Sequence, residues 1–253
     1  MPDELGGFQT AGLSWAQRAK CGELNAVLSP AGSERRNRFL HHMQMFAASK
    51  VIWPNVDNPV LVDFGCGTGR FVRLFGGRSR LIVGTEITKE MLCAARQYGL
   101  PETAALLLTD GVNLPFRDES VDLIWCCGVL RYSLFVLKPA YAQIAQEMFR
   151  VLKPGGRVVN CEMYVDVGPD VFIKDFEAAG FETSSKRVLN RHFARMEQIL
   201  QSRRVPLRAI AFTARLCAAI RYYFDNPAWR FRGLRDYMFI WLKHGCVDSG
   251  MSR

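Results

Sequence analysis

The residues with the clearest chemical potential lie in one run, from Val60 to Arg70, which reads VLVDFGCGTGR. Its apolar start predicts a buried strand, and an acid, Asp63, and glycines at alternate positions follow at once. Glycine permits a sharp turn and lets a ligand approach the backbone without a Cβ in the way. A strand that leads through a glycine-rich turn into a helix is typical of nucleotide sites in doubly wound sheets. The spacing Gly-x-Gly-x-Gly, unlike the Gly-x-Gly-x-x-Gly of dinucleotide folds, favours S-adenosylmethionine, which presents no phosphate to a helix N-terminus.

The elements that must position this run alternate between strand and helix patterns. Apolar runs predict strands at 60–64, 80–86, 104–109, 121–127, 157–164, 181–188 and 237–243. This alternation predicts an α/β fold with a Rossmann-like, doubly wound, mostly parallel seven-stranded sheet. N-terminal helices and a helical insertion before the last strand complete the expected architecture.

Four segments follow from these patterns. Residues 1–58 form an N-terminal helical cap, in which Ser14 and Gln17 cap a helix that runs to about Leu28. Residues 59–189 form the Rossmann-like, cofactor-binding core, 190–236 form a basic, aromatic helical insertion, and 237–253 form the last core strand and tail. The eight cysteines show no metal-ligand spacing, so we expect no metal and a cytoplasmic protein with reduced thiols.

Four motifs occur in order along the core. They are VDFGCGTG at 62–69, TEITKEML at 85–92, TDGVNLPF at 109–116 with VDLI at 121–124, and RVLKPGG at 150–156. In these motifs the sequence resembles the class I S-adenosylmethionine-dependent methyltransferases of the type 11-like group, over about residues 58–188. The resemblance implies a methyltransferase whose cofactor is S-adenosylmethionine.

The first two motifs suggest contacts with the cofactor. Gly65, Cys66 and Gly67 would carry the backbone past the methionine moiety, and Asp63 would orient the turn or accept from the ammonium through water. Glu86, followed by Ile87, ends the second predicted strand, where one carboxylate can accept from both ribose hydroxyls. The alternatives are a turn acid at Asp63 and a helix-start acid at Glu86.

The third motif and the fourth strand complete the expected cofactor site. The resemblance implies that Asp110 accepts from the adenine amine, with the backbone of Gly111 nearby; a capping aspartate is the alternative. Cys127 ends the fourth predicted strand, at the edge where ligands bind in such sheets.

The sequence leaves the catalytic residues open. Many relatives carry a histidine after the fourth strand, whereas this chain has GVLRY at 128–132. The remaining candidates are Arg131, Tyr132 and His192, with surface packing as the alternative. A general base is not essential, because an activated sulfonium methyl needs mainly an aligned acceptor and the exclusion of water.

The basic insertion is the second informative region. The net charge is +9, and residues 182–253 hold 14 Lys and Arg against 5 Asp and Glu, which accounts for the whole excess. One helical face carries Phe212, Leu216, Ala219, Ile220 and Tyr223, and Arg208 and Arg215 share another. Three interpretations follow: a lid over an anionic acceptor, with Tyr132, Arg221 and Tyr222 as substrate contacts; a membrane-surface face; or a structural elaboration.

The sequence therefore predicts methyl transfer to a small-molecule or lipid-like acceptor, with peripheral membrane contact as a further option. An RNA methyltransferase is one alternative, supported only by the positive charge, so nucleic acid is the less favoured partner. A non-catalytic, cofactor-binding scaffold is the other, supported only by the missing histidine. The oligomeric state does not follow from the sequence.

Overall fold

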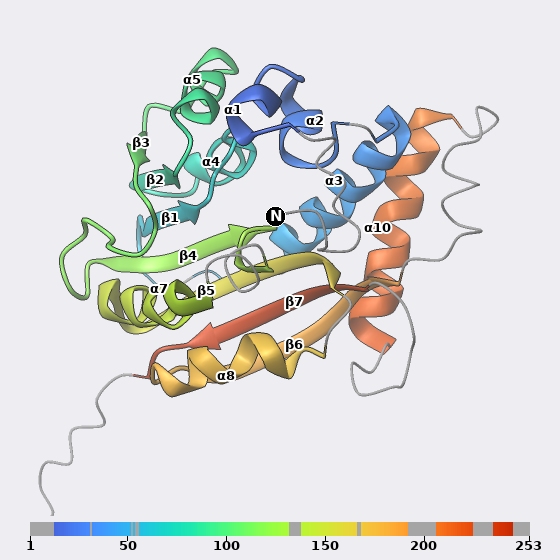
Figure 1. Ribbon diagram of the computed structural model, residues 1–253. Coiled ribbons are helices and arrows are strands. Elements are labelled where there is room, and N and C mark those ends of the chain that lie inside the picture. The colour runs from blue at the N-terminus through green and yellow to red at the C-terminus, as the bar shows by residue number, and fades with distance from the viewer. Residues whose placement is uncertain are drawn as a thin grey trace, which may run out of the picture.

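In the computed structural model, seven strands form one sheet in the order β3-β2-β1-β4-β5-β7-β6 (Figure 1). The strands are β1 (Val60–Phe64), β2 (Leu81–Glu86), β3 (Ala104–Leu108), β4 (Val121–Cys127), β5 (Leu152–Val165), β6 (Glu182–Arg191) and β7 (Arg235–Leu242). The structure describes residues 13–30, 32–51, 53, 56–131, 138–165, 168–191, 206–224 and 235–244. The predicted doubly wound, mostly parallel sheet is confirmed.

Helices flank the sheet on both sides, and the N-terminal helices lie together at one end of the strands with α10 beside α3 (Figure 1). They are α1 (Trp15–Arg18), α2 (Glu23–Val27), α3 (Glu34–Ser49), α4 (Arg70–Gly76), α5 (Lys89–Gln97), α7 (Lys138–Val151), α8 (Asp170–Ala178) and α10 (Leu207–Phe224). Helix α10 lies within the predicted insertion, and α1 to α3 lie within the predicted N-terminal cap.

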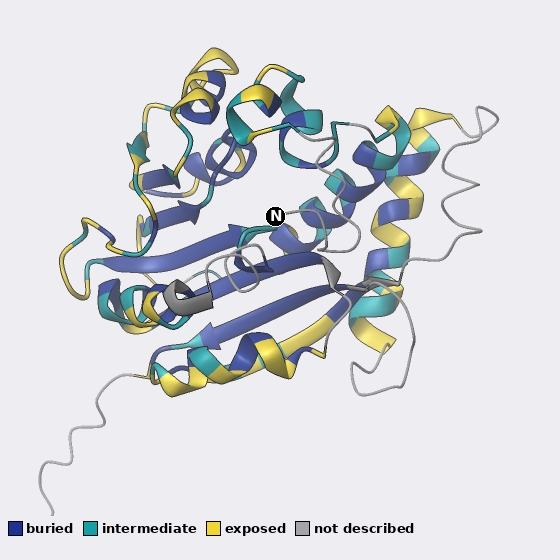
Figure 2. Ribbon diagram, in the orientation of Figure 1, coloured by how far each residue is buried: buried dark blue, intermediate teal, exposed yellow. Residues whose placement is uncertain are grey.

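Strand β4 separates two apolar cores, because successive side chains of a strand point to opposite faces. Leu123 and Trp125 belong to one core, in which the Trp125 ring lies 4.9 Å from Phe71 and 5.6 Å from Phe75, between ring centroids. Ile124 belongs to the other core, with residues of α7 and α8. Burial on both faces explains why this strand is apolar at nearly every position (Figure 2).

The last strand lies inside the sheet, antiparallel to both of its neighbours. In β7, Ile240 is in register with Val159 of β5 and with Ser185 of β6. The aromatic side chains of β7 stack over α8, where the Trp241 and Phe176 ring centroids are 3.9 Å apart. Strand β6 therefore forms the edge of the sheet, and β7 joins it to the parallel strands.

The predicted first helix is wrong in its extent. Ser14 and Gln17 form the predicted capping box, but α1 ends at Arg18 and a separate helix begins at Glu23. Gly22 between them has φ +87°, a left-handed conformation that helices do not continue through.

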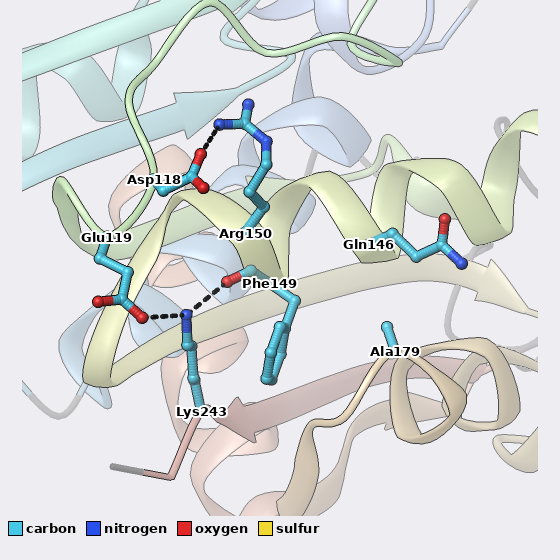
Figure 3. A pocket seen from close by; sticks show the side chains of 7 residues that line it. All are labelled: Asp118, Glu119, Gln146, Phe149, Arg150, Ala179 and Lys243. Carbon is cyan, nitrogen blue, oxygen red and sulfur yellow. Dashed lines mark hydrogen bonds and ion pairs between the residues drawn. The ribbon is translucent and has the colours of Figure 1, made fainter. Parts of the chain in front are cut away.

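A cavity of about 560 Å³ opens at the side of the sheet where the parallel strands β4 and β5 begin (Figure 3). The buried Lys243 ammonium donates there to the carbonyl oxygens of Phe149 at 3.0 Å and Leu152 at 2.8 Å, and to Glu119 at 3.2 Å. Arg150 is likewise engaged by Asp118. Both cations already have protein partners. We therefore interpret the residues around this cavity as a structural junction that connects β7, β5 and α7.

We expect Lys243→Met to lower the free energy of unfolding by about 1–3 kcal/mol, because two carbonyls lose their charged donor. Urea denaturation measures the change. Lys186→Met is the matched control, because Lys186 pairs with Asp170 on the surface and such pairs contribute at most about 1 kcal/mol. Equal stabilities of the two variants would contradict the junction.

Candidate functional site

The glycine-rich turn between β1 and α4 adopts the conformation that its composition predicts. Gly65, Gly67 and Gly69 have φ values of +68°, +53° and +74°, which residues with a Cβ rarely adopt. A Cβ on Gly65 would also lie 2.4 Å from Cγ2 of Val129, just after β4. The turn therefore packs directly against the carboxyl end of β4, and glycine is needed for both reasons.

Glu86, at the carboxyl end of β2, holds this turn in place. Its Oε2 accepts from the Gly67 amide at 3.0 Å, and its Oε1 accepts from the Ile87 and Thr88 amides at 2.9 and 3.1 Å. Burial raises the pKa of Glu86, while these backbone donors act in the opposite direction. A carboxylate offers about four acceptor positions, and the Thr88 side chain also hydrogen-bonds to Glu86, so these protein donors use most of them. The organising role toward the turn was not predicted from the sequence.

Asp63 is a buried carboxyl group at the end of β1, only 1% exposed. Its Oδ2 atom has no hydrogen-bond partner among the described residues. Burial raises the pKa of Asp63 to about 7, although the nearby charge of Arg70 lowers it. An unpartnered buried carboxyl oxygen is costly, and a cationic ligand would relieve that cost.

Arg70 is a second buried charge, which the sequence analysis missed. Its Nη1 donates to Nδ1 of His41 and to Oε1 of Gln44, both at 3.0 Å, and Gln44 Nε2 lies 2.9 Å from the Met163 sulfur. Burial, reinforced by Arg70, lowers the pKa of His41 to about 3, so this imidazole is a neutral acceptor. A cation on the first residue of a helix opposes the helix dipole, and that conflict was the available signal.

Helix α2 of the N-terminal segment packs over the glycine-rich turn. Glu23 forms an ion pair with Arg73, and its carbonyl oxygen accepts from the Thr68 hydroxyl at 3.2 Å. A Cβ on Gly67 would lie 2.6 Å from Cγ1 of Val27. The sequence interpretation left that space to the cofactor, whereas the structure places Val27 there.

The third motif caps its own turn. Asp110 is exposed, and its Oδ1 accepts from the amides of Val112 at 2.9 Å and Asn113 at 3.3 Å. Gly111 has φ +77°, and a Cβ there would lie 2.7 Å from the Phe64 ring. This is the geometry of the capping alternative, and the contact between Asp110 and adenine stays a prediction.

Two groups from β4 and β5 complete the carboxyl edge. Half-buried Cys127 is in register with Cys161, and the hydrogen bond of the Cys161 thiol to Cys127, together with burial, raises the pKa of Cys161. Glu162, next along β5, accepts from the Leu130 amide at 2.8 Å, and burial raises its pKa to about 7. Glu162 therefore anchors the segment after β4, which includes the buried Arg131.

The structure describes only some of the remaining sequence candidates. Tyr132 and His192 lie outside the described residues. Tyr222, beside Arg221 near the end of α10, contacts the Phe46 ring edge-on at 5.9 Å and lies 5.8 Å below the Arg187 guanidinium. The structure thus places Tyr222 against α3 and β6, and a substrate contact there stays a prediction.

Two kinds of site are absent from the described ranges. Within them, no group of three His, Cys, Asp or Glu residues is placed to hold a metal ion. None of the described helices has the length and apolar character to cross a membrane.

Residues 62–160 match the profile of the family described as Methyltransferase domain. Biotin biosynthesis bifunctional protein BioHC of Cellvibrio japonicus is 38% identical over 40% of this chain and 19% of its own length. Demethylmenaquinone methyltransferase of Corynebacterium kroppenstedtii is 33% identical over 43% and 44%. Probable tRNA methyltransferase 9B of Homo sapiens is 32% identical over 42% and 24%. This chain thus aligns with less than half the length of each of these relatives.

The fold matches solved structures over most of the chain. Phosphoethanolamine N-methyltransferase 2 of Haemonchus contortus, in complex with S-adenosyl-L-methionine, superposes with a TM-score of 0.53 at 15% identity, over 83% of this chain and 53% of its own. The fold is that of the class I methyltransferases. The family match covers residues 62–160 of this chain, and the structural neighbour was solved with S-adenosyl-L-methionine bound.

Cofactor binding should be coupled to the ionisation of Asp63. Its pKa of about 7 in the free protein should fall when a cation binds, so binding should release a proton near neutral pH. Affinity should decrease below about pH 7, approaching tenfold per pH unit, and level off above it. Calorimetry in two buffers of different ionisation enthalpy measures the proton release.

Asp63→Asn should abolish this coupling, and Asp170→Asn, at an exposed carboxylate, should preserve it. The folded protein also holds the Asp63 proton more tightly than the unfolded chain, so this group should reduce stability as pH rises from about 4 to 7. An affinity that is constant between about pH 6 and 8 would contradict the assignment.

Glu86→Ala should weaken S-adenosylmethionine binding by about 10- to 100-fold, because a charged acceptor is lost and the turn loses its anchor. The melting temperature of the free protein should fall as well. Titration calorimetry and thermal melts separate the two effects, with Glu90→Ala, at an exposed residue of α5, as the control. A folded Glu86→Ala protein with the parental affinity would refute the role of this carboxylate.

Proposed function

We propose that this protein transfers the methyl group of S-adenosylmethionine to a small-molecule or lipid-like acceptor by in-line displacement. The carrying observation is the buried Asp63 carboxyl group, whose Oδ2 lacks a partner among the described residues at the carboxyl end of the central strand β1. A ligand with a cationic ammonium group supplies the partner that this site lacks. When bound, S-adenosylmethionine supplies a methyl group already activated by its sulfonium.

The described residues suggest how the cofactor would be held. Asp63 would accept from the ammonium, and the Glu86 carboxylate would accept from the ribose hydroxyls. The backbone from Gly65 to Gly67 would pass the methionine moiety. Asp110 and Gly111 would border the adenine, and Cys127 would lie at the junction between cofactor and acceptor.

The surroundings of Met163 support a small or lipid-like acceptor. This residue of β5 packs in an apolar cluster with Leu28, Phe39, Leu40 and Met43 from the N-terminal segment. Such a cover excludes water and leaves alignment of the acceptor as the main contribution of the protein. Neutral His41 already accepts from Arg70 and is therefore unsuited to act as a base near neutral pH.

A tRNA acceptor is the second candidate. It is favoured by the similarity to probable tRNA methyltransferase 9B and by the net charge of +9. The apolar cover over the carboxyl edge favours the first candidate, because RNA recognition uses open basic grooves and stacking surfaces.

Metabolite and lipid profiling of a strain that lacks the gene tests the acceptor class. We expect a small or lipid-extractable species lighter by one CH₂ unit to accumulate, and the wild-type gene to reverse this. A gene that encodes Asp63→Ala should fail to do so, whereas Asp170→Ala should succeed. Purified protein with methyl-labelled cofactor should label the accumulated species. Label transferred to tRNA alone would decide for the second candidate.

A further inference from the structure

Helix α10 is apolar on two opposite faces. Its inner face, with Ile210, Ala214 and Ala218, is buried in a cluster with Met43 of α3 and Met163 of β5. Its outer face is solvent-exposed (Figure 2), at Phe212 by 70%, Leu216 by 46%, Ile220 by 49%, Tyr223 by 57% and Phe224 by 77%. We call these five residues the outer stripe. A contiguous exposed stripe of this kind marks an interaction surface, because helices that are apolar all round are normally buried.

This geometry corrects the lid interpretation of the helix. The face that carries Phe212, Leu216 and Ile220 was expected to line an acceptor pocket if the insertion is a lid. The structure turns it outward and docks the opposite face on α3 and β5. These side chains are therefore available to a partner outside the chain.

Cations border the outer stripe. Helices α3 and α10 together contain six arginines and a single carboxylate, Glu34, which pairs with Arg38 at 2.9 Å. Arg208 and Arg215 lie along one side of the stripe by helical position. Arg215 and Arg38 both lie near His42 of α3, and their charges, after burial, lower the pKa of that histidine. The surface thus combines inserted apolar side chains with a positive border.

We propose that the outer stripe of α10 docks the protein on the surface of an anionic membrane. The helix would lie in the plane of the interface, with Phe212, Leu216 and Ile220 among the acyl chains. Arg208 and Arg215 would reach up to the headgroup phosphates while their stems cover apolar surface.

Charge complementarity selects this partner over a second copy of the chain. Two α10 helices packed stripe to stripe would bring Arg208 and Arg215 toward their counterparts, and α10 contains no carboxylate to offset them. Leu216 and Ile220 in the middle of the stripe are aliphatic and give no stacking surface for nucleic-acid bases, whereas the aromatic members of the stripe could stack, so RNA binding is one outcome of the test below. An anionic bilayer matches both the apolar and the cationic parts of the surface.

The docking face is connected to the cofactor corner through α3, which runs beside α10 (Figure 1). Phe46 and Lys50 of α3 contact Tyr222 and Tyr223 of α10, and Gln44 of the same helix contacts Arg70. Docking would therefore bring the carboxyl edge of the sheet toward the bilayer. The inference goes beyond the proposed function and does not depend on the identity of the acceptor.

Vesicle flotation with the full chain tests the proposal without any methyl donor or acceptor. The probes are vesicles of phosphatidylcholine alone and of phosphatidylcholine with phosphatidylglycerol. We expect binding to the anionic vesicles, and at least a tenfold loss in Phe212→Ser/Ile220→Ser, because two large apolar side chains no longer insert. Arg208→Gln/Arg215→Gln should lose about fivefold per arginine on anionic vesicles only.

Val171→Ser on α8 is the control, since Val171 is also exposed, by 44%, but lies on another helix. It should bind like the parent, and thermal melts and cofactor titration should be unchanged in all variants. Equal flotation of parent and Phe212→Ser/Ile220→Ser protein, or no preference for anionic vesicles, would overturn the proposal. A dimer in sedimentation analysis that this double variant dissolves, or RNA binding that it removes, without vesicle binding, would also overturn it. None of these outcomes would alter cofactor affinity. Failure of the membrane proposal is therefore distinguishable from failure of the proposed function.

Discussion

The buried carboxyl group of Asp63 is the constraint around which the site is organised. Parallel strands direct their carboxyl ends toward one edge, and the side chain that ends β1 is enclosed by the glycine-rich turn and by α4. Isolation from water makes ionisation of this group unfavourable, and no neighbour fully compensates it. A cationic ligand would relieve this cost, and the proposed cofactor carries such a group in its ammonium.

Two further groups hold the glycine-rich turn in place beside Asp63. Glu86 accepts a hydrogen bond from the Gly67 amide. Arg70 donates to neutral acceptors on α3, which belongs to the N-terminal cap. Because Gln44 and His41 are uncharged, they bind the guanidinium without neutralising it. Arg70 therefore still acts on Asp63 through its charge, which keeps the carboxyl pKa from rising further.

The N-terminal cap and α10 act together as one wall of the molecule. Helix α3 contacts Arg70 of α4 on one side and α10 on the other, and the apolar cluster around Met163 joins α3, α10 and β5. The same wall presents a cationic, apolar surface outward. Under the proposed function, the apolar inner side of this wall would keep water away from the acceptor.

The sequence by itself determined the local elements and predicted the cofactor. Strands β1 and β4 begin and end at the predicted residues, because central parallel strands are apolar throughout and have no competing period. The glycine spacing determined the turn, since positive φ values at Gly65, Gly67 and Gly69 leave few other residues possible. Glu86 and Asp63 were identified by their positions at strand ends, although the hydrogen bonds of Glu86 to the turn were not.

Only the tertiary structure decided the arrangements that depend on distant contacts. Nothing local shows that β7 pairs antiparallel between β5 and β6, because strand pairing is a long-range choice. Arg70, His41 and Gln44 meet only when α3 folds over α4, and their separation along the chain hides the network. For α10, helical periodicity identified an apolar face but could not decide between two such faces. Small Ala214 and Ala218 permit close approach to α3, so that face is buried and the aromatic face remains outside.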